Sequence, residues 1–557
     1  MRHAGRVLIE QLEAQGVDTV FCVPGESYLA ALDGLYDSNR IRTVVCRQEG
    51  GAAMMADAHA RMTGRVGVAF VTRGPGAANA SIGIHIAQQD SIPLVLFVGL
   101  PGRDVEDREA FQEFDLRAVF GSLAKWAEVV SDPARLPEYV SRAFHIAASA
   151  RPGPVVLGLP EDMLATSLDV AVVRASRPAE SAPVAADMLE LAGLLANAAR
   201  PVVILGGPGW SASIKARFED LAKKLGLPVA CSFRCQDYFD NRHPCYAGHA
   251  GIAPDPKLAE AIRSADLLLV IGARLGEMTT SGYALVEAPE PKQKLVHVHP
   301  SADELGRVYR AELPICASAG TFVDALSSLA IKRSTGWAER TAGLHAAYQA
   351  FCRPEPTPGA LKLELVIANL EDMLPDDAIV SNGAGNYAGF LNRYFVYKQF
   401  RTQLGPTCGA MGFGLPAAIA AKLTHPERTV VAMAGDGCFM MNGQELATAV
   451  QYGANVIVLV ANNGMYGTIR MHQEREYPGR VMATSLVNPD FAALARSYGA
   501  FGETVTQTEQ FRGAFARAVE SGTPALLDLK LDPEALTPKM TLAQVRAAAE
   551  KAEGSRQ

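Results

Sequence analysis

Two short polar motifs in the last third of the chain have the residue types of a magnesium site. Gly435-Asp436-Gly437 follows the apolar run 430–434, and Asn463 follows a second apolar run, 456–461. Both runs are typical of buried parallel strands, and ligands of open α/β sheets gather where such strands end. A carboxylate and an amide oxygen are hard ligands, which Mg²⁺ accepts while it keeps a substrate phosphate. The sequence therefore predicts a bound magnesium diphosphate.

The surroundings of Asp436 support this prediction. Its two glycine neighbours let backbone N–H groups approach a phosphate closely, and we expect the segment 439–452 to be a helix whose N-terminus faces the same phosphate. A Gly-Asp-Gly alone is a weak signal, because glycine turns after strands are common. The paired Asn462-Asn463 at a second strand end makes the signal specific.

This pair of motifs resembles the cofactor motif of the thiamin diphosphate enzymes. The resemblance implies that Asp436 and Asn463 hold Mg²⁺ by their side chains and that the Met465 carbonyl is a further ligand. Cys438 stands where many members have serine beside the diphosphate, so a weakened contact is expected there. The residues assigned to the diphosphate from this motif are Gly435, Gly437, Cys438 and Asn463.

Length and composition exclude several classes of function. A chain of 557 residues exceeds one hydrophobic core, and 49% apolar with 20% charged residues is typical of a soluble globular protein. The net charge of −7 and the lack of a long basic cluster argue against nucleic acid as a partner. Neither a signal peptide nor a membrane-spanning apolar run is evident, so we expect a cytoplasmic protein without a membrane partner.

The nine cysteines are scattered and odd in number, which argues against a disulfide framework. A group of cysteines and histidines between residues 231 and 249 could suggest zinc, but the spacing fits no common zinc pattern. We interpret these residues as ordinary buried or surface thiols and imidazoles.

Apolar strands alternate with helical patterns along the chain, which predicts parallel, doubly wound α/β sheets. Proline-rich joints at 173–187 and 353–358 separate the units. The glycine-rich strand end 206–209 lacks the full dinucleotide fingerprint, so a structural role is the better prediction for it. The expected units are residues 1–170, 188–335 and 359–535, followed by a helical tail, 536–557, that is either a lid or a frayed end.

In order and size, these units are similar to the pyrimidine-binding, central and diphosphate-binding domains of the thiamin diphosphate family. The family uses its cofactor as an electron sink for 2-oxo acid chemistry. Glu49 follows the strand 43–46 and matches the glutamate that activates the aminopyrimidine ring in this family. Burial against that ring would raise the pKa of such a glutamate. An alternative is an acid favoured by a helix dipole.

Two further glycine-rich segments match the family's cofactor loops. Met411, within Gly409-Ala410-Met411-Gly412, has the position of the bulky side chain under the cofactor, although by composition alone such a methionine usually fills a core. The Gly409 carbonyl is expected at the pyrimidine amino group. Gly385 and Asn386, after the strand 378–380, are assigned to the other diphosphate loop.

The segment Ala110-Phe111-Gln112-Glu113, with Lys125 beyond it, is similar to the large, catalytic subunit of acetolactate synthase. The resemblance implies that Phe111 and Gln112 line the substrate pocket with Gly25, and that Gln112 takes part in catalysis. It also implies a role in branched-chain amino acid biosynthesis.

Two departures from that subfamily, and one from the wider thiamin diphosphate family at Arg73, bear on the substrate. Met278 takes the place of an arginine that holds the acceptor carboxylate, and a thioether cannot make that contact. His472 takes the place of an acceptor-selecting tryptophan and is assigned to the pocket, either as acid or base or as a polar wall. Arg73 stands in a loop where serine is commoner. The acceptor is therefore open: a second oxo acid, an aldehyde or a proton.

The leading hypothesis is a thiamin diphosphate and Mg²⁺ dependent enzyme that decarboxylates a pyruvate-like 2-oxo acid and ligates the two-carbon unit to a second carbonyl compound. The alternative is a 2-oxo acid decarboxylase or an acyloin or benzaldehyde-type lyase. A non-catalytic scaffold would have lost Glu49, Asp436 or Asn463, and all three are present. The family architecture implies a homodimer or homotetramer with active sites at the subunit interface, and FAD in the central domain is a further candidate cofactor. The sequence does not decide whether a small regulatory subunit binds.

Overall fold

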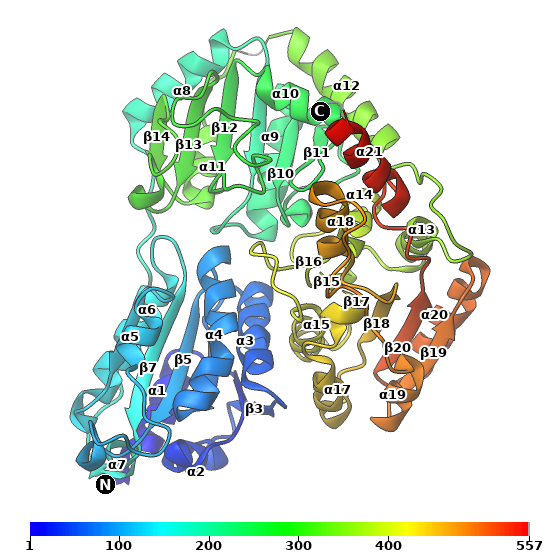
Figure 1. The fold of residues 1–557 in the computed structure, drawn as a ribbon. Helices are drawn as coiled ribbons and strands as arrows, with labels where there is room; N and C mark the ends of the chain where they lie inside the picture. Colours follow the sequence, from blue (N-terminus) through cyan, green and yellow to red (C-terminus); the bar gives the residue numbers. More distant parts are fainter. Residues whose placement is uncertain (176, 333, 555–557) are drawn as a thin grey trace.

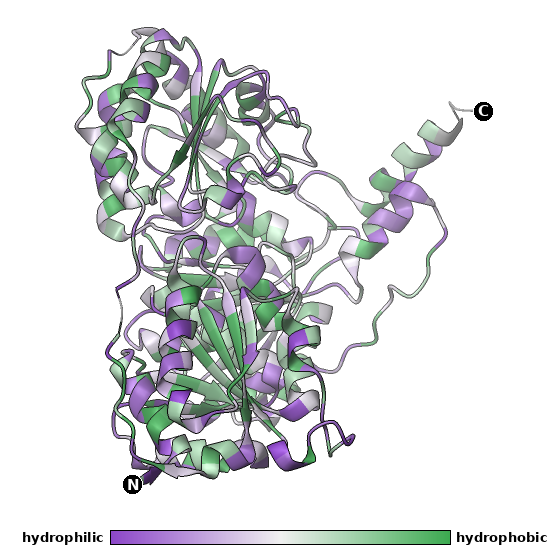
Figure 2. Cartoon of the chain, turned by 90° about the vertical axis from the view of Figure 1, so that its left-hand side faces the viewer, coloured by the Kyte–Doolittle hydropathy of each residue, from purple (hydrophilic) through white to green (hydrophobic). Residues whose placement is uncertain are grey.

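The computed structural model describes residues 1–175, 177–332 and 334–554. Three six-stranded parallel sheets occupy successive parts of the chain, and helices cover both faces of each sheet (Figure 1). The apolar strands lie inside these layers, while polar residues concentrate on the outer faces of the helices (Figure 2). The predicted fold class, three doubly wound parallel α/β domains, is confirmed.

The N-terminal sheet has the strand order β3-β2-β4-β5-β7-β6. Apolar runs in the sequence predict five strands here, at 19–23, 43–46, 66–71, 94–98 and 155–159, and all five are present with ends shifted by one or two residues. The sequence does not predict the partly buried edge strand β6. A two-stranded antiparallel ribbon of β1 (Arg2–His3) and β8 (Ser167–Leu168) joins the two ends of this domain. The strands are β2 Thr19–Cys22, β3 Arg42–Val45, β4 Gly67–Thr72, β5 Leu94–Leu100, β6 Trp126–Val129 and β7 Pro154–Pro160. The helices are α1 Ala4–Ala14, α2 Leu29–Asp37, α3 Glu49–Thr63, α4 Arg73–Asp90, α5 Leu116–Phe120, α6 Leu136–Ala148 and α7 Glu161–Ala165.

The central sheet has the strand order β11-β10-β9-β12-β13-β14 and its own hydrophobic cores. The apolar runs 202–205 and 267–271 predict only two of its six strands, β9 and β12. The strands are β9 Pro201–Leu205, β10 Val229–Ser232, β11 Tyr246–Ala250, β12 Leu267–Ile271, β13 Lys294–His299 and β14 Leu313–Cys316. The helices are α8 Ala185–Asn197, α9 Ala212–Leu225, α10 Pro256–Arg263, α11 Ala319–Ser327 and α12 Gly336–Phe351.

The C-terminal sheet has the strand order β16-β15-β17-β18-β20-β19, and its two middle strands carry the predicted metal motifs. The strands are β15 Ile379–Asn382, β16 Gln403–Leu404, β17 Val430–Gly435, β18 Ile457–Asn462, β19 Phe501–Val505 and β20 Ala525–Lys530. The helices are α13 Leu363–Met373, α14 Tyr387–Tyr394, α15 Gly414–Thr424, α16 Asp436–Phe439, α17 Leu446–Tyr452, α18 Gly467–Glu476, α19 Phe491–Ser497, α20 Phe511–Glu520 and α21 Leu542–Gly554.

Helix α3 joins the N-terminal and C-terminal domains into one hydrophobic core. Every residue from Gly50 to Ala60 is buried, because α3 packs on α4 of its own domain and on α15 of the C-terminal domain. The same cluster of apolar side chains therefore contains residues of both domains. The two domains stand side by side below the central domain (Figure 1).

Two helical predictions need correction. The segment 439–452 is not one helix: α16 ends at Phe439, and α17 begins at Leu446 after a 3₁₀ turn. Asn442 causes the break, since its side chain donates to the Gly412 carbonyl (3.1 Å) and its backbone leaves the helical region. The tail helix begins only at Leu542, and it packs on α18. Within the described ranges, none of the helices has the length and apolar character needed to span a bilayer.

Candidate active site

Asp436 begins the turn after β17 and is 2% exposed. Its carboxylate accepts hydrogen bonds from the backbone N–H groups of Gly437 and Gly464, both 2.8 Å long. Burial raises its pKa, and these hydrogen bonds act in the opposite direction. The bond to Gly464 links the ends of the adjacent strands β17 and β18, so the two predicted metal motifs lie together at one edge of the sheet.

Asn463 and Met465 follow β18 at this edge. The Asn463 side-chain oxygen accepts from the Met465 N–H (3.3 Å). Asn488, which the sequence analysis did not single out, donates to Asp436 (2.8 Å) and to Asn462 (3.0 Å). Because its amide bridges the two motifs, Asn488 orients the Asp436 carboxylate. No signal near Asn488 in the sequence marks this role.

The loop 383–386 after β15 lies against the Asp436 turn. Gly385 has φ +147°, and a Cβ there would lie 2.7 Å from the Tyr387 ring, so the position requires glycine. The Asn386 side chain accepts from Thr468 of α18 (3.0 Å). The Cys438 thiol accepts from the Gly412 N–H (3.3 Å) and the Tyr387 hydroxyl (3.4 Å). Cys438 is therefore held between the cofactor loops by its side chain.

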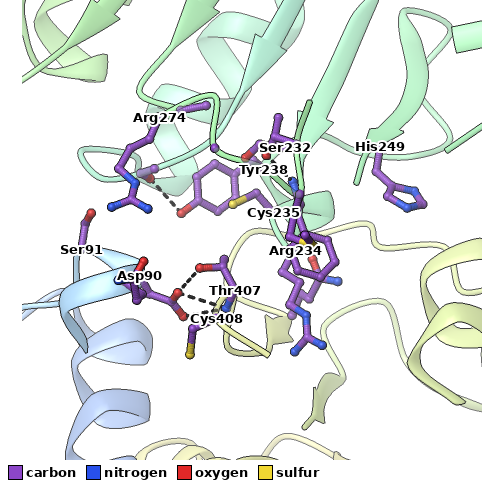
Figure 3. Close-up of a pocket in the computed structure, with 18 of the residues that line it drawn as sticks. Asp90, Ser91, Ser232, Arg234, Cys235, Tyr238, His249, Arg274, Thr407 and Cys408 are labelled. Carbon is purple, nitrogen blue, oxygen red and sulfur yellow. Dashed lines mark hydrogen bonds between the residues drawn. The ribbon is translucent and has the colours of Figure 1, made fainter. Parts of the chain in front are cut away.

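The Gly409–Met411 loop is anchored to the N-terminal domain. Gly409 is exposed with φ +70°, and nothing lies within 4 Å of a Cβ built on it, so the space beside this residue is open. Met411 is half-buried against the shared core. Just before them, the Thr407 backbone N–H donates to Asp90 of α4 (3.0 Å), and the Thr407 hydroxyl also contacts Asp90 (Figure 3).

Glu49 is the first residue of α3, so its carboxylate stands at a helix N-terminus. This position is compatible with an acid favoured by the helix dipole and also with the activating glutamate of the family. The side chain is half-exposed and accepts from Asn79 of α4 (2.9 Å). A Cβ on Gly76 would lie 3.4 Å from its carboxylate oxygen, so α4 passes close by.

A buried carboxylate of the C-terminal domain holds the backbone just before Glu49. Glu445 is 0% exposed, and one of its oxygens accepts from the N–H groups of Arg47 and Gln48, both 3.0 Å away. The other oxygen accepts from the Thr448 hydroxyl (2.6 Å). Burial raises the pKa of Glu445. The sequence analysis missed this residue, because its partners lie far away along the chain.

The remaining residues assigned to the N-terminal domain gather at the carboxyl edge of its sheet, the edge that also presents Glu49. Gln112 has φ +64°, and its carbonyl accepts from the Gly74 N–H (3.0 Å). Phe111 is 70% exposed, with the Arg73 guanidinium 5.8 Å from its ring centroid. A Cβ on Gly25 would clash with Thr72 at the end of β4.

A cavity of about 1710 Å³ lies between the three domains. Several residues assigned from the sequence line it: Met278, Gly385, Asn386, Gly409 and His472. Within the described ranges, its wall does not include Gly25, Glu49, Phe111 and Gln112, and it does not include Met411, Asp436, Asn463 and Met465 either. One chain thus brings its assigned residues together in two sets, one at the edge of the N-terminal sheet and one around the C-terminal sheet and the cavity.

The sequence of the chain matches models of known protein families. Three models of thiamine pyrophosphate enzyme domains match the chain: the N-terminal TPP binding domain at residues 2–119, the central domain at 188–326 and the C-terminal TPP binding domain at 383–529. Together they cover most of the sequence. The chain belongs to the thiamine pyrophosphate (thiamin diphosphate) enzyme family.

Within that family the chain is similar to acetolactate synthase large subunits. It is 32% identical over 538 residues to that of Parasynechococcus marenigrum, which covers 94% of this chain and 86% of the relative. It is 31% identical over 548 residues to that of Corynebacterium glutamicum (95% and 87%) and 30% identical over 530 residues to the isozyme 2 large subunit of Escherichia coli (94% and 95%). The protein is a thiamin diphosphate-dependent enzyme that catalyses a carboligation.

Proposed function

We propose that this enzyme uses thiamin diphosphate and Mg²⁺ to decarboxylate a pyruvate-like 2-oxo acid and to ligate the two-carbon unit to a second carbonyl compound. The observation that carries the proposal is the buried Asp436 carboxylate beside Asn463 at the ends of β17 and β18. Asp436, Asn463 and the Met465 carbonyl fit Mg²⁺ as oxygen donors. The Gly385–Asn386 loop and the N–H group of 438 fit the diphosphate, whereas the Gly437 N–H already donates to Asp436.

The chain's own groups would set up the reaction. Bound thiamin diphosphate supplies an electron sink for the decarboxylation. Glu49 would hold and move a proton at the aminopyrimidine, and the carbonyl of the exposed residue Gly409 would accept from the amino group of that ring. Met411 would support the folded shape of the cofactor. Gln112 and His472 would contact the substrate.

The substitution Glu49→Gln tests the proposal. It removes the exchangeable proton but keeps the shape of the side chain, so turnover should fall by about a hundredfold or more, the usual range of a positioned acid or base. Binding of the cofactor, measured by calorimetry with Mg²⁺, should persist. Glu138→Gln, on the exposed face of α6, is the matched control. Unchanged turnover in Glu49→Gln would refute the assignment.

We further propose that two chains complete each site. The edge that carries Glu49 and the Asp436 turn both lie outside the wall of the cavity of their own chain, so this cavity does not join them. The pairing of one chain's N-terminal domain with another chain's C-terminal domain is what the family architecture implies. Large apolar side chains are exposed beside both sets of residues, as a subunit interface requires. They include Ile82 and Phe111 on one side and Met440, Met441 and Val487 on the other. Sedimentation should give a dimer or tetramer, and a fully active monomer would contradict this.

Decarboxylation without a second oxo acid is the competing function. The half-buried Met278 lines the cavity and offers no charge to an acceptor carboxylate, which favours an aldehyde or a proton as acceptor. Product analysis with pyruvate decides: acetolactate supports the leading proposal, and acetaldehyde or an acyloin supports the alternative.

FAD in the central domain stays a prediction. The turn at Gly207–Gly209 and the Arg274 side chain line the cavity, and the volume of the cavity exceeds what a substrate needs. The Arg274 side chain extends from the central domain (Figure 3). The visible spectrum of the purified protein, with bands near those of free flavin or without them, tests it.

A further inference from the structure

Arg73 is a departure from the family pattern to which the proposed function gives no role. It is the first residue of α4, directly after β4, and β4 lies between β2 and β5 in the N-terminal sheet. The residue is 7% exposed and has φ +34°, a left-handed conformation that a non-glycine residue rarely adopts. A buried charge at a strained backbone position requires specific partners.

The Arg73 guanidinium connects segments that follow three other strands of this sheet. Its Nη2 donates to Glu161 (2.9 Å), which follows β7, and its Nη1 forms an ion pair with Glu26 (3.1 Å), which follows β2. Nη1 also donates to the backbone carbonyl of Phe111 (3.4 Å) in the loop after β5. A serine side chain at this position is too short to join these segments. Because two carboxylates already engage the charge, we assign Arg73 to positioning and not to the binding of an anion.

The loop between β5 and α5 has a strained backbone. Asp107 (φ +61°) and Gln112 (φ +64°) both have left-handed conformations. Such conformations persist only where surrounding contacts hold them. Part of this support is internal, because the Glu113 carboxylate accepts from the N–H groups of Asp107 (2.7 Å) and Ala110 (2.8 Å). The conformation at Gln112 requires further contacts from outside the loop.

The start of α4 supplies these outside contacts. The Gly74 N–H donates to the Gln112 carbonyl (3.0 Å), and Arg73 donates to the carbonyl of the preceding residue, Phe111. Two consecutive carbonyls of the loop thus accept from two consecutive residues of the helix. The same helix also donates to the Glu49 carboxylate. The first turns of α4 therefore fix the loop relative to the predicted activating acid.

We propose that Arg73 is a positioning residue, which holds Phe111 and Gln112 in place for contact with the donor substrate. The inference rests on the proposed function, which places Gln112 at the substrate. Without the guanidinium, the loop loses a contact beside its left-handed residue, and its backbone relaxes to conformations that displace both side chains. Contacts with the donor are then lost and its affinity falls. The groups assigned to the cofactor diphosphate lie in the C-terminal domain and keep their positions.

The test compares the KM for pyruvate with the affinity for thiamin diphosphate. The substitution Arg73→Met keeps much of the length of the side chain but removes its charge and its donors. The KM for pyruvate should rise about tenfold, the range of one lost contact in a substrate pocket. The Kd of thiamin diphosphate, measured by calorimetry with Mg²⁺, should stay at the wild-type value. Because KM does not depend on how much of a variant folds, a variant that loses only stability keeps the wild-type KM.

Two further variants make the test specific. Arg73→Lys keeps the charge, and its compact ammonium group can pair with one carboxylate, so the rise in KM should be smaller than in Arg73→Met. Arg103→Met is the matched control, because the Arg103 guanidinium donates to Asp162 of α7 (2.8 Å) and to the Ser131 carbonyl. It should keep the wild-type KM. An unchanged KM in Arg73→Met, or an equal rise in Arg103→Met, overturns the inference.

Hydrogen exchange gives a readout that does not depend on turnover. The N–H groups of Gly74 and Ala110 both donate to acceptors in the loop, so their protection should fall in Arg73→Met and persist in Arg103→Met. Lower protection with an unchanged KM means that the loop does not contact the donor, and wild-type protection in Arg73→Met means that Arg73 does not hold the loop. Either result overturns the inference. If the wild type binds thiamin diphosphate but converts no pyruvate, the proposed function fails and the inference falls with it.

Discussion

Replacing Glu445 by alanine tests whether the C-terminal domain positions the activating acid. The variant Glu445→Ala removes the acceptor of the Arg47 and Gln48 N–H groups, each 3.0 Å from one oxygen. Leaving buried donors unsatisfied costs about 1–3 kcal/mol each, partly offset because a buried carboxylate no longer loses its hydration. We expect the free energy of unfolding to fall by about 2–4 kcal/mol. Glu49 follows directly, and a shift of about 1 Å in a catalytic group costs about a hundredfold in rate.

Three measurements separate positioning from simple destabilisation. Hydrogen exchange at the amides of residues 47 and 48 should accelerate in Glu445→Ala, and kcat should fall more than the affinity for thiamin diphosphate. Glu445→Gln retains an oxygen that can accept both bonds, so it should restore most of kcat. Wild-type kcat together with wild-type amide protection in Glu445→Ala would refute the reasoning.

The pH dependence of stability gives an independent check on the same residue. Burial raises the pKa of Glu445 above its usual 4.5, so the folded chain binds its proton more tightly than the unfolded chain does. The resulting stability is complete below pH 4.5 and is lost as the pH rises through the folded pKa. Denaturant unfolding should therefore show this decline in the wild type, and Glu445→Gln should lack it.

Three further predictions concern the metal site, the approach of two domains and the tail. Asp436→Asn should abolish Mg²⁺-dependent uptake of thiamin diphosphate in calorimetry, because the site loses its one negative charge; normal uptake would contradict the assignment. Gly51→Val should lower both the melting temperature and kcat, since a Cβ there lies 2.5 Å from the Glu445 carboxylate; a wild-type melting curve would argue against that contact. Arg546→Met should speed proteolysis of α21, because Arg546 binds Glu474 of α18 at 2.6 and 2.7 Å. Mainly through this bond, the pKa of Glu474 falls to about 2. The stabilisation that the bond gives is therefore present above pH 4.5 and is lost as the pH falls toward 2. Equal rates of proteolysis of the wild type and of Arg546→Met at pH 7 would refute the prediction.

Much of the fold could be predicted because buried parallel strands are continuous apolar runs. β5, β17 and β18 have this pattern, and the polar residues that follow β17 and β18 lie together as predicted. β16 and β19 were missed, since β16 has two residues and β19 is only partly buried. The interior strands β10, β13 and β20 were missed as well, because polar residues such as His297 and Asp528 interrupt or shorten their apolar runs. The break in the segment 439–452 depends on a tertiary hydrogen bond, which local pattern cannot reveal.

The residues of the candidate site also divide into those that a local sequence pattern marks and those that it does not. Residues beside a strand end, such as Asp436 and Glu49, could be found from motif and position alone. Asn488 and Glu445 could not, because each acts through a contact with a distant part of the chain. Their residue types are ordinary for surface positions, and only the folded structure makes them buried groups with specific partners.

Helix α3 also constrains how the protein is made. It has almost no polar face, and one of its two buried sides is covered by α15, which begins at Gly414. A ribosome therefore completes the first domain long before the covering helix is synthesised. An apolar helical surface is exposed to solvent throughout that interval. We expect the isolated residues 1–170 to aggregate or to bind chaperones, and the helix to become protected only when the last third of the polypeptide has emerged.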